Sequence, residues 1–459
     1  MEQEISMISA NESQFKKMTR TPIPRLIFTL AIPTIMSMLI SAIYNTADTF
    51  FVSRLGTSAS GAVGIVFSLM AIFQAIGFTL GNGAGSLISR KLGARDVVTA
   101  SRYASTSFFA AIGVGSVFCL LGLIFIDKLM MALGSTPTIL PFSRSYARYI
   151  LLGAPIMCAS FVMNNILRSE GRAAFAMVGL VSGGVLNIIL DPIFIFTMGL
   201  GISGAAIATL ISQCLSFFLL CSFFYRGKSV IRISVSNISK NAREYLQILS
   251  LGCPSLCRQG LASIATVALN VSAAAYGDAA IAAMSIVGRI FMFILSVILG
   301  IGQGFVPVAG YNYGAKKYIR VKQAYWFTVK AGLCISGLLA IAGMIFAPTL
   351  IAVFLNDSEA IKIGTVAIRM QCAALLLHPM FVYTNMLMQA TGHAISSTFL
   401  ACNRQGIYFL PLIMTLPDMF GLTGIQMTQP VADILSFFTC LPFLYMFMTK
   451  LNERIRFLP

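Results

Sequence analysis

The chain has 459 residues, of which 57% are hydrophobic and only 10% are charged. Soluble domains carry about 25% charged residues, so this composition excludes an ordinary soluble protein and indicates one whose solvent is largely lipid. The formal net charge of +17 does not predict nucleic-acid binding, because the basic residues form short clusters between apolar runs.

Apolar segments long enough to cross a hydrocarbon core of about 30 Å recur along the whole chain. Residues 1–24 are polar and basic, and they lack the apolar region and cleavage site of a signal peptide. Six predicted spans follow, near residues 26–52, 60–88, 101–127, 141–167, 173–197 and 203–224. After a basic connector come six more, near 244–273, 279–309, 323–346, 360–389, 394–416 and 424–448.

The predicted fold class is therefore an all-α membrane protein with twelve transmembrane helices in two six-helix lobes. The expected parts are an N-terminal segment 1–24, an N-lobe 25–224, a connector 225–243, a C-lobe 244–449 and a C-terminal tail 450–459. An even number of spans puts both termini on one side, and most lysines and arginines fall on that side. By the positive-inside rule, both termini and the connector are predicted to be cytoplasmic, in a bacterial inner membrane.

An internal repeat connects the two halves. A shift of 221 residues aligns, without a gap, Pro33 with Pro254, Gly56 with Gly277, Gly81 with Gly302, Gly83 with Gly304, Gly93 with Gly314 and Gly171 with Gly392. These are helix-breaking residues, which chance seldom places at one offset. Since each half has an even number of spans, we expect a pseudo-twofold axis along the membrane normal, with a pathway between the lobes.

Two carboxylates lie at predicted membrane depth in the first half. An ionisable residue there costs about 2.5–3.5 kcal/mol on insertion scales, so it needs a partner or a function. Asp48 lies late in the first span, and Asp191 follows Asn187 by one turn on the same face of the fifth. Such carboxylates beside neutral oxygens suit a proton or a sodium ion. The alternative is that each aspartate only hydrogen-bonds a neighbouring helix.

The stretch from Leu30 through Pro33 to the run Asp48-Thr49-Phe50-Phe51-Val52-Ser53-Arg54-Leu55-Gly56 resembles the first helix of multidrug and toxic compound extrusion (MATE) transporters. The connectors Gly93-Ala94-Arg95 and Gly314-Ala315-Lys316 and the two equal halves are similar to the same family. The resemblance covers nearly the whole chain. It points to the DinF-like/MepA-like bacterial branch, which has an acidic residue in the first helix and an Asn-x-x-x-Asp pair in the fifth.

The resemblance implies a cation-coupling site at Asp48, Asn187, Asp191 and Thr209. If the coupling ion is sodium, the metal ligands would be Asp48, Asn187 and Asp191. Tyr44 and Asn164 are implied neighbours of this site, and together with Arg258 and Gln259 they are assigned to a substrate cavity. No cofactor is expected beyond the coupling ion, H+ or Na+, and the residues leave both ions open.

The second half departs from the NorM-like branch of the family, which has acids in the seventh and tenth spans. Here those spans carry Arg258 and Gln259, and Arg369, Gln371 and His378. His378 is either a hydrogen-bonded structural residue or a proton relay. Four arginines lie at membrane depth, namely Arg258, Arg289, Arg369 and Arg404, whereas Asp433 is the main acid there. Either they bond backbone carbonyls and snorkel, or some line a wet cavity and contact anionic groups.

The implied function is export of amphipathic, often cationic compounds in exchange for protons or sodium ions, by alternating access. We expect small-molecule drugs and the lipid bilayer as partners, a monomer, no ATPase subunit and no enzymatic activity. The near-match to a phosphate loop at Gly227-Lys228-Ser229 lacks its first glycine. The alternative is a flippase for a lipid-linked or other anionic substrate, suggested by the four arginines. A third class, a channel or receptor, is disfavoured by the tandem halves.

Overall fold

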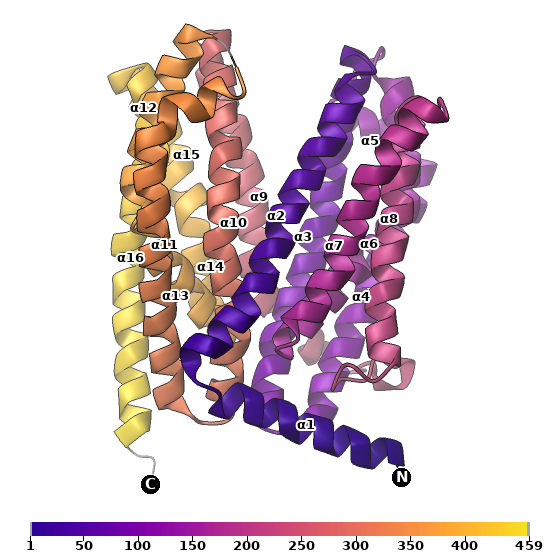
Figure 1. Cartoon of the computed structure of the whole chain (residues 1–459), viewed down its shortest axis with the longest axis vertical. Coiled ribbons are helices and arrows are strands. Elements are labelled where there is room, and N and C mark those ends of the chain that lie inside the picture. Colours follow the sequence, from indigo (N-terminus) through magenta and orange to yellow (C-terminus); the bar gives the residue numbers. More distant parts are fainter. Residues whose placement is uncertain (1, 356, 457–459) are drawn as a thin grey trace. The chain divides into compact units, whose positions relative to one another are not determined.

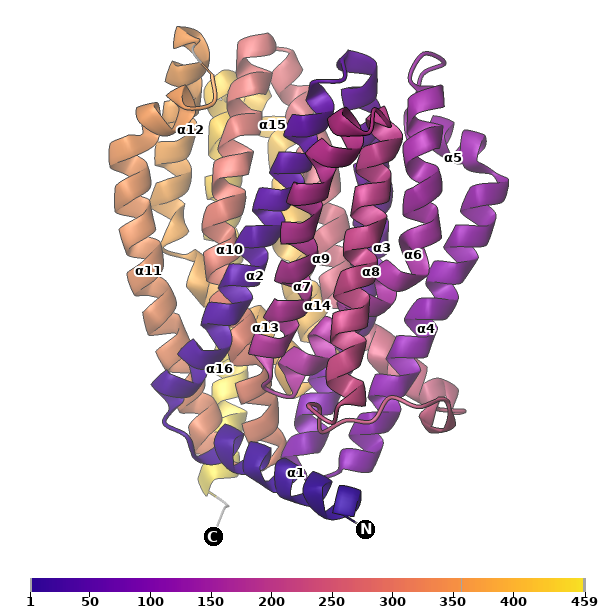
Figure 2. The same cartoon turned by 45° about the vertical axis from the view of Figure 1, so that its right-hand side comes forward.

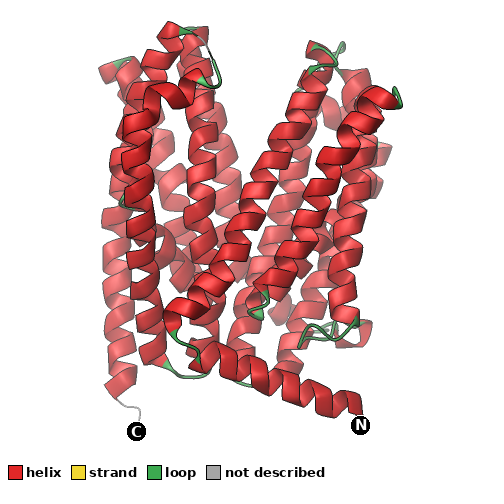
Figure 3. Cartoon of the chain, in the orientation of Figure 1, coloured by secondary structure: helices red, strands yellow, loops and turns green. Residues whose placement is uncertain are grey.

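The computed structural model describes residues 2–355 and 357–456, and these residues are almost entirely helical, with short turns (Figure 3). The first half contains α1 Glu2–Arg20, α2 Ile23–Ser53, α3 Thr57–Gly93, α4 Val97–Ile124, α5 Ile126–Ala132, α6 Leu140–Ser169, α7 Ala173–Pro192, η1 Ile193–Thr197 and α8 Gly201–Tyr225. After η2 Val235–Asn237 come α9 Ala242–Ala274, α10 Asp278–Gly314, α11 Tyr318–Ala352, α12 Ser358–Leu375, α13 His378–Thr391, α14 Ala394–Cys402, η3 Asn403–Phe409, α15 Leu410–Phe420 and α16 Leu422–Arg456.

Twelve helical segments of the described chain match the twelve predicted spans. Nine helices are long and apolar enough to cross a membrane, and α12 with α13 forms a tenth span across a bend of 55°. The other two are α9, which carries Arg258, and the segment α14–η3–α15, which a π-helix interrupts. The predicted fold class is confirmed. The structure adds that α1 covers most of the N-terminal segment and that α16 continues beyond the last predicted span to Arg456.

The chain forms two compact units whose boundaries fall inside helices. The first unit comprises residues 1–18 and 36–252, and the second comprises 19–35 and 253–459. One boundary lies in the last turn of α1, between Met18 and Thr19, and the other two lie in α2 and α9, near Pro33 and Pro254, which the 221-residue shift aligns. A proline within a helix removes one backbone hydrogen bond and permits a change of direction. Sequence analysis places the lobe boundaries between helices. In the structure, the first part of α2 belongs to the second unit and the first part of α9 belongs to the first unit, so the two halves of the chain exchange helix segments.

Glycines let the exchanged segments pack closely in each unit. In the first unit, a Cβ atom on Gly83 of α3 would collide with the carbonyl oxygen of Ile248 and the amide nitrogen of Gly252 on α9. In the second unit, a Cβ atom on Gly304 of α10 would lie 2.7 Å from the amide nitrogen of Ala31 on α2. The 221-residue shift aligns both partners, so the same close crossing is built twice.

The turns of the two halves share their backbone conformation too. Gly56 (φ 111°) precedes α3, and Gly277 (φ 93°) precedes α10. Arg95 (φ 63°) and Lys316 (φ 58°) are the non-glycine residues with positive φ among those described, and they occupy aligned turns after α3 and α10. A left-handed residue that is not glycine is uncommon, so its recurrence at one offset supports the repeat independently.

A buried carboxylate holds the connector and α1 to the first unit. Glu170, in the turn between α6 and α7, accepts hydrogen bonds from the Ser229 hydroxyl at 2.5 Å and the Val230 N–H at 3.0 Å. The Nε atom of Arg172 lies 3.6 Å from the same carboxylate. Gln14 of α1 donates to the Glu170 carbonyl oxygen at 2.6 Å, and α1 runs across this end of the unit (Figures 1 and 2).

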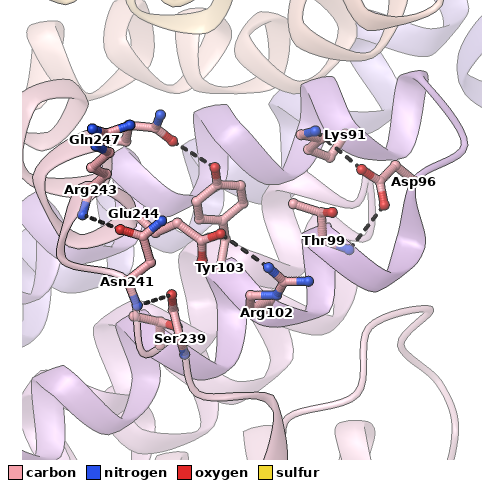
Figure 4. A network of polar contacts seen from close by, with 11 residues as sticks. Lys91, Asp96, Thr99, Arg102, Tyr103, Ser239, Asn241, Arg243, Glu244 and Gln247 are labelled. Carbon is pink, nitrogen blue, oxygen red and sulfur yellow. Dashed lines mark hydrogen bonds and ion pairs between the residues drawn. The ribbon is translucent and has the colours of Figure 1, made fainter.

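A second polar network ties the start of α9 to α4 (Figure 4). The Tyr103 hydroxyl donates to Oε1 of Gln247 at 2.6 Å, and Arg102 pairs with Glu244 at 3.2 Å. The carboxylate of Asp96 caps the first turn of α4 by accepting from a backbone N–H. These contacts explain why the first turns of α9 belong to the first unit rather than to the second.

The crossing at Gly83 predicts that Gly83→Ala destabilises the protein. A methyl group there meets backbone atoms, which cannot rotate away, and overpacking of this kind costs about 1–3 kcal/mol. Gly64→Ala, on the same helix, meets nothing within 4 Å and is the matched control. We expect a lower thermal midpoint in detergent for Gly83→Ala and no decrease for Gly64→Ala. Equal midpoints would contradict the close crossing.

Glu170 predicts a pH-dependent stability. It lies outside the membrane-spanning segments, and complete burial raises the pKa of its carboxyl from 4.5 to about 7, against the opposing effect of its hydrogen bonds. The unfolded chain therefore loses this proton near pH 4.5 and the folded chain only near pH 7. Stability is greatest below pH 4.5 and falls by about 3 kcal/mol as the pH rises to 7.

The test is to measure thermal midpoints of the native protein and of Glu170→Gln between pH 4.5 and pH 8. The glutamine cannot ionise, so the native midpoint is expected to fall relative to that of the variant as the pH rises. Parallel profiles for the two proteins would show that Glu170 does not carry this dependence.

Candidate functional site

Four side chains from three helices form a buried acidic cluster in the first unit. Asp48 comes from α2, Asn187 and Asp191 from α7, and Thr209 from α8. The Asn187 amide nitrogen lies 3.2 Å from Oδ1 of Asp191 and 3.3 Å from the Thr209 hydroxyl. Asp48 is 3% exposed and Asp191 is 0% exposed. The structure thus brings together the residues that sequence analysis assigned to the cation-coupling site.

Tyr146 of α6 is the residue of this cluster that sequence analysis missed. It is fully buried, its hydroxyl donates to Oδ2 of Asp48 at 3.2 Å, and the same hydroxyl is within hydrogen-bonding reach of Thr209. It therefore connects α6 with α2 and α8. In the sequence, a tyrosine between Arg144 and Arg148 near a span's start resembles an ordinary interfacial aromatic, so no local pattern marks it.

Three buried acceptor oxygens of the cluster have no hydrogen-bond donor. They are Oδ1 of Asp48, Oδ1 of Asn187 and Oδ2 of Asp191. Leaving buried acceptors unsatisfied is costly, whereas hard cations prefer oxygen ligands and a carboxylate can also take a proton. The donor set therefore fits a sodium ion or a proton. The cluster contains two carboxylates, and no group of three or more His, Cys, Asp or Glu side chains that could hold a metal ion occurs among the described residues.

Tyr44 and Asn164 adjoin this cluster. With Asn187 and Thr209 they line a cavity of about 40 Å³ in the first unit. One water needs roughly 10–15 Å³ of such space, and drug-sized ligands occupy pockets of about 300–1,000 Å³. This cavity therefore has room for a few waters or a small ion, but not for an amphipathic drug.

Asn164 also has a structural contact that recurs in the second half. Its amide donates to the carbonyl oxygen of Ala176 at 2.8 Å. Asn385, at the position aligned by the 221-residue shift, donates to the carbonyl oxygen of Ser397 at 2.5 Å, and Ala176 aligns with Ser397. The Asn164 amide nitrogen is thus committed to joining α6 to α7, which leaves its carbonyl oxygen for the cavity.

Arg258 and Gln259 of α9 line a different and larger cavity, of about 560 Å³, inside the second unit. The four residues assigned to the substrate cavity are therefore divided, two in each unit. The two cavities differ more than tenfold in volume, so only the one in the second unit is large enough for a drug-sized molecule.

The other three arginines of the second half have different environments. Arg404 Nε lies 2.7 Å from Oδ1 of Asp433, whose Oδ2 lies 3.6 Å from His378. Arg369 donates to a backbone carbonyl oxygen of α11 at 3.3 Å, and Arg289 is exposed. Asp433 therefore compensates one arginine only. Both interpretations from the sequence apply, since Arg369 bonds a carbonyl group whereas Arg258 and Arg404 line a cavity.

Comparison with known proteins identifies the family. The MatE family model matches residues 33–193 and 254–412, which together exceed half of the chain and correspond to the two halves of the repeat. The chain belongs to the MATE family. The resemblance noted in the first helix and in the glycine connectors is thereby confirmed, and the helices of the described chain correspond to those of a MATE transporter.

Curated relatives and solved MATE structures match nearly the full length. The multidrug export protein MepA of Staphylococcus saprophyticus is 28% identical over 424 residues, covering 92% of this chain and 93% of that protein. MepA of Staphylococcus aureus strain N315 is 28% identical over 447 residues, covering 96% and 98%. The crystal structure of MATE in complex with MaL6 has a TM-score of 0.89 at 29% identity, covering 96% and 99%. An outward-facing multidrug resistance MATE family transporter has a TM-score of 0.90 at 29% identity, covering 95% and 98%.

The contact between Tyr146 and Asp48 predicts energetic coupling of the two residues. Tyr146→Phe removes a donor to a buried carboxylate and is expected to cost about 1.5–3 kcal/mol of stability. Combined with Asp48→Asn, the total cost should fall short of the sum of the single costs by at least about 0.5 kcal/mol. Thermal unfolding in detergent measures all four proteins. Tyr146→Phe with Asp418→Asn, an exposed aspartate on α15, is the control pair and should be additive.

Proposed function

We propose that this MATE family protein exports amphipathic compounds in exchange for a proton or a sodium ion bound at Asp48, Asn187, Asp191 and Thr209. The observation that carries the proposal is the set of three buried oxygens without donors, on two different spans. The multidrug export function of the MepA relatives supports drugs as the substrate class.

The proposed coupling follows from the negative charge of the buried acidic cluster. Without a cation, the carboxylates of Asp48 and Asp191 are costly to keep together in a buried site, which favours a conformation that separates or hydrates them. A bound cation offsets that charge and draws α2 towards α7. In the proposed mechanism, the drug binds best to the cation-free conformation. The cation and the drug then shift the same conformational equilibrium in opposite directions, so each ligand displaces the other. Inward flow of the ion thereby drives outward flow of the drug without ATP.

The proposal also covers the membrane in which the protein lies, its orientation there and its oligomeric state. The protein is a multi-pass membrane protein, and we place both termini in the cytoplasm of a bacterial cell, at the inner membrane. Basic residues at the turn after α3, at the turn after α10 and near the end of α16 support this orientation. The substrates are small molecules, and the working form is a monomer that needs no ATPase subunit and no cofactor beyond the coupling ion.

A second candidate keeps the fold and changes the substrate. The cavity of the second unit is lined by Arg258 and Arg404, which favours an anionic substrate such as a lipid-linked compound moved by a flippase. Replacing these arginines would then stop movement of an anionic lipid and leave export of a cationic dye intact. The multidrug relatives favour the first candidate.

The proposed coupling is tested by ethidium uptake into inverted membrane vesicles under imposed proton or sodium gradients. We expect gradient-driven uptake with the native chain and a loss of at least about tenfold with Asp191→Asn, because the amide cannot carry the charge that binds the cation. Asp418→Asn makes the same substitution at an exposed site and should transport normally. The gradient that drives uptake identifies the ion. Absence of gradient-driven uptake by folded native protein would refute cation-coupled dye export.

A further inference from the structure

The large cavity of the second unit occupies the same place in the repeat as the small cavity beside the acidic cluster of the first unit. The 221-residue shift aligns residues that line the one with residues that line the other: Tyr44 with Ala265, Asn164 with Asn385, and Gly183 with Arg404. After deletion of one residue, Gly201-Ile202-Ser203-Gly204 aligns with Gly421-Leu422-Thr423-Gly424, and Thr209 then corresponds to the lining residue Gln429. The two cavities therefore occupy equivalent positions in the repeat.

The two cavities differ in the charge in and around them: two aspartates lie beside the first, which has a neutral lining, whereas arginines line the second. Leu269 and Leu412 stand where the first half has Asp48 and Asp191, so the second half lacks both carboxylates. Arg404 stands where the first half has a glycine, and it lines the cavity. The second half therefore lacks the two carboxylates that suit a cation and has an arginine at the equivalent place.

The cavity retains positive charge after its internal pairing. Asp433 accepts from Arg404 at 2.7 Å and from Gln429 at 2.9 Å, so this carboxylate is committed to Arg404. Among the described residues, none hydrogen-bonds or ion-pairs with the guanidinium of Arg258, and no residue lining the cavity is acidic. Two arginines and one aspartate leave a net positive charge at Arg258.

Snorkelling does not account for Arg258. Helix α9 runs from Ala242 to Ala274, so Arg258 lies sixteen residues from either end. At a rise of about 1.5 Å per residue, each end is roughly 24 Å away, well beyond the reach of one side chain. A cation held at this depth needs an anionic partner, and none of the residues that the structure describes supplies one.

The remaining lining and the size define the rest of the ligand. The volume of about 560 Å³ lies in the range of drug-sized pockets, and the walls include Met284, Phe291 and Phe381. Aromatic and methionine side chains bind apolar bodies of varied shape. A guanidinium pairs with a carboxylate through two parallel hydrogen bonds.

We propose that the cavity of the second unit binds an amphipathic organic anion, whose acidic group pairs with Arg258 and whose apolar body lies against Phe291 and Phe381. This inference rests on the proposed transport function for the fate of the ligand, and it adds acidic compounds to the substrates. In this arrangement, the first unit binds the coupling cation and the second unit binds the exported molecule.

The test uses the full-length protein in phosphatidylcholine nanodiscs, titrated calorimetrically with 1-naphthoate and with 1-naphthamide, which has the same shape without the charge. We expect naphthoate to bind at least about tenfold more tightly than naphthamide, as one charge-assisted pair provides. Arg258→Gln should abolish this preference and Arg258→Lys should retain part of it. Arg369→Gln is the matched control, because Arg369 bonds a carbonyl oxygen and does not line the cavity.

Equal affinities of the native protein for naphthoate and naphthamide would overturn the inference, as would an undiminished preference in Arg258→Gln. If Arg258→Gln fails to fold, the comparison of the two ligands on the native protein and on Arg258→Lys decides. Competition by phosphatidylglycerol in the nanodisc would make a lipid headgroup the ligand and overturn the assignment to a free organic anion. Binding is measured without an ion gradient, so the two proposals can fail separately. Loss of ethidium transport with intact naphthoate binding would refute the proposed function alone. Intact ethidium transport without preferential naphthoate binding would refute this inference alone.

Discussion

Unpaired charge is costly inside a bilayer, and the polar interior of this protein is arranged around that cost. Each buried ionic group has either a partner or a cavity. Asp48 receives the Tyr146 hydroxyl, and Asp433 pairs with Arg404. Among the polar groups of the described residues that lack a partner are three acceptor oxygens of the acidic cluster and the guanidinium of Arg258. In a membrane protein such places identify the ligands more directly than the helices around them do.

The repeat explains why these two places resemble each other in position and differ in chemistry. A duplicated six-helix design provides each unit with a cavity at the same point, and substitutions then changed the lining. The first cavity is small and lies beside two carboxylates, whereas the second is larger and is lined by arginines.

The glycine crossings hold parts of α2 and α9 in different compact units. Gly83 and Gly304 let α3 and α10 contact the backbone of α9 and α2, each within one compact unit. The helices α2 and α9 therefore have one part in each unit, with Pro33 and Pro254 near the point of change. Asp48 lies on the part of α2 that belongs to the first unit, so the cation of the proposed mechanism would act on a helix that has one part in each unit.

Composition, hydropathy and the constant offset are properties of the sequence alone, and they determined the membrane environment, the twelve spans and the two halves, because lipid demands long apolar helices. The Asn187 and Asp191 pair was also visible, since a spacing of four residues fixes one helix face. Only the tertiary structure placed Tyr146 against Asp48, paired Arg404 with Asp433, divided the cavity residues between two units and exchanged segments of α2 and α9. Those outcomes depend on contacts between helices that are far apart in the chain, and local periodicity does not predict such contacts.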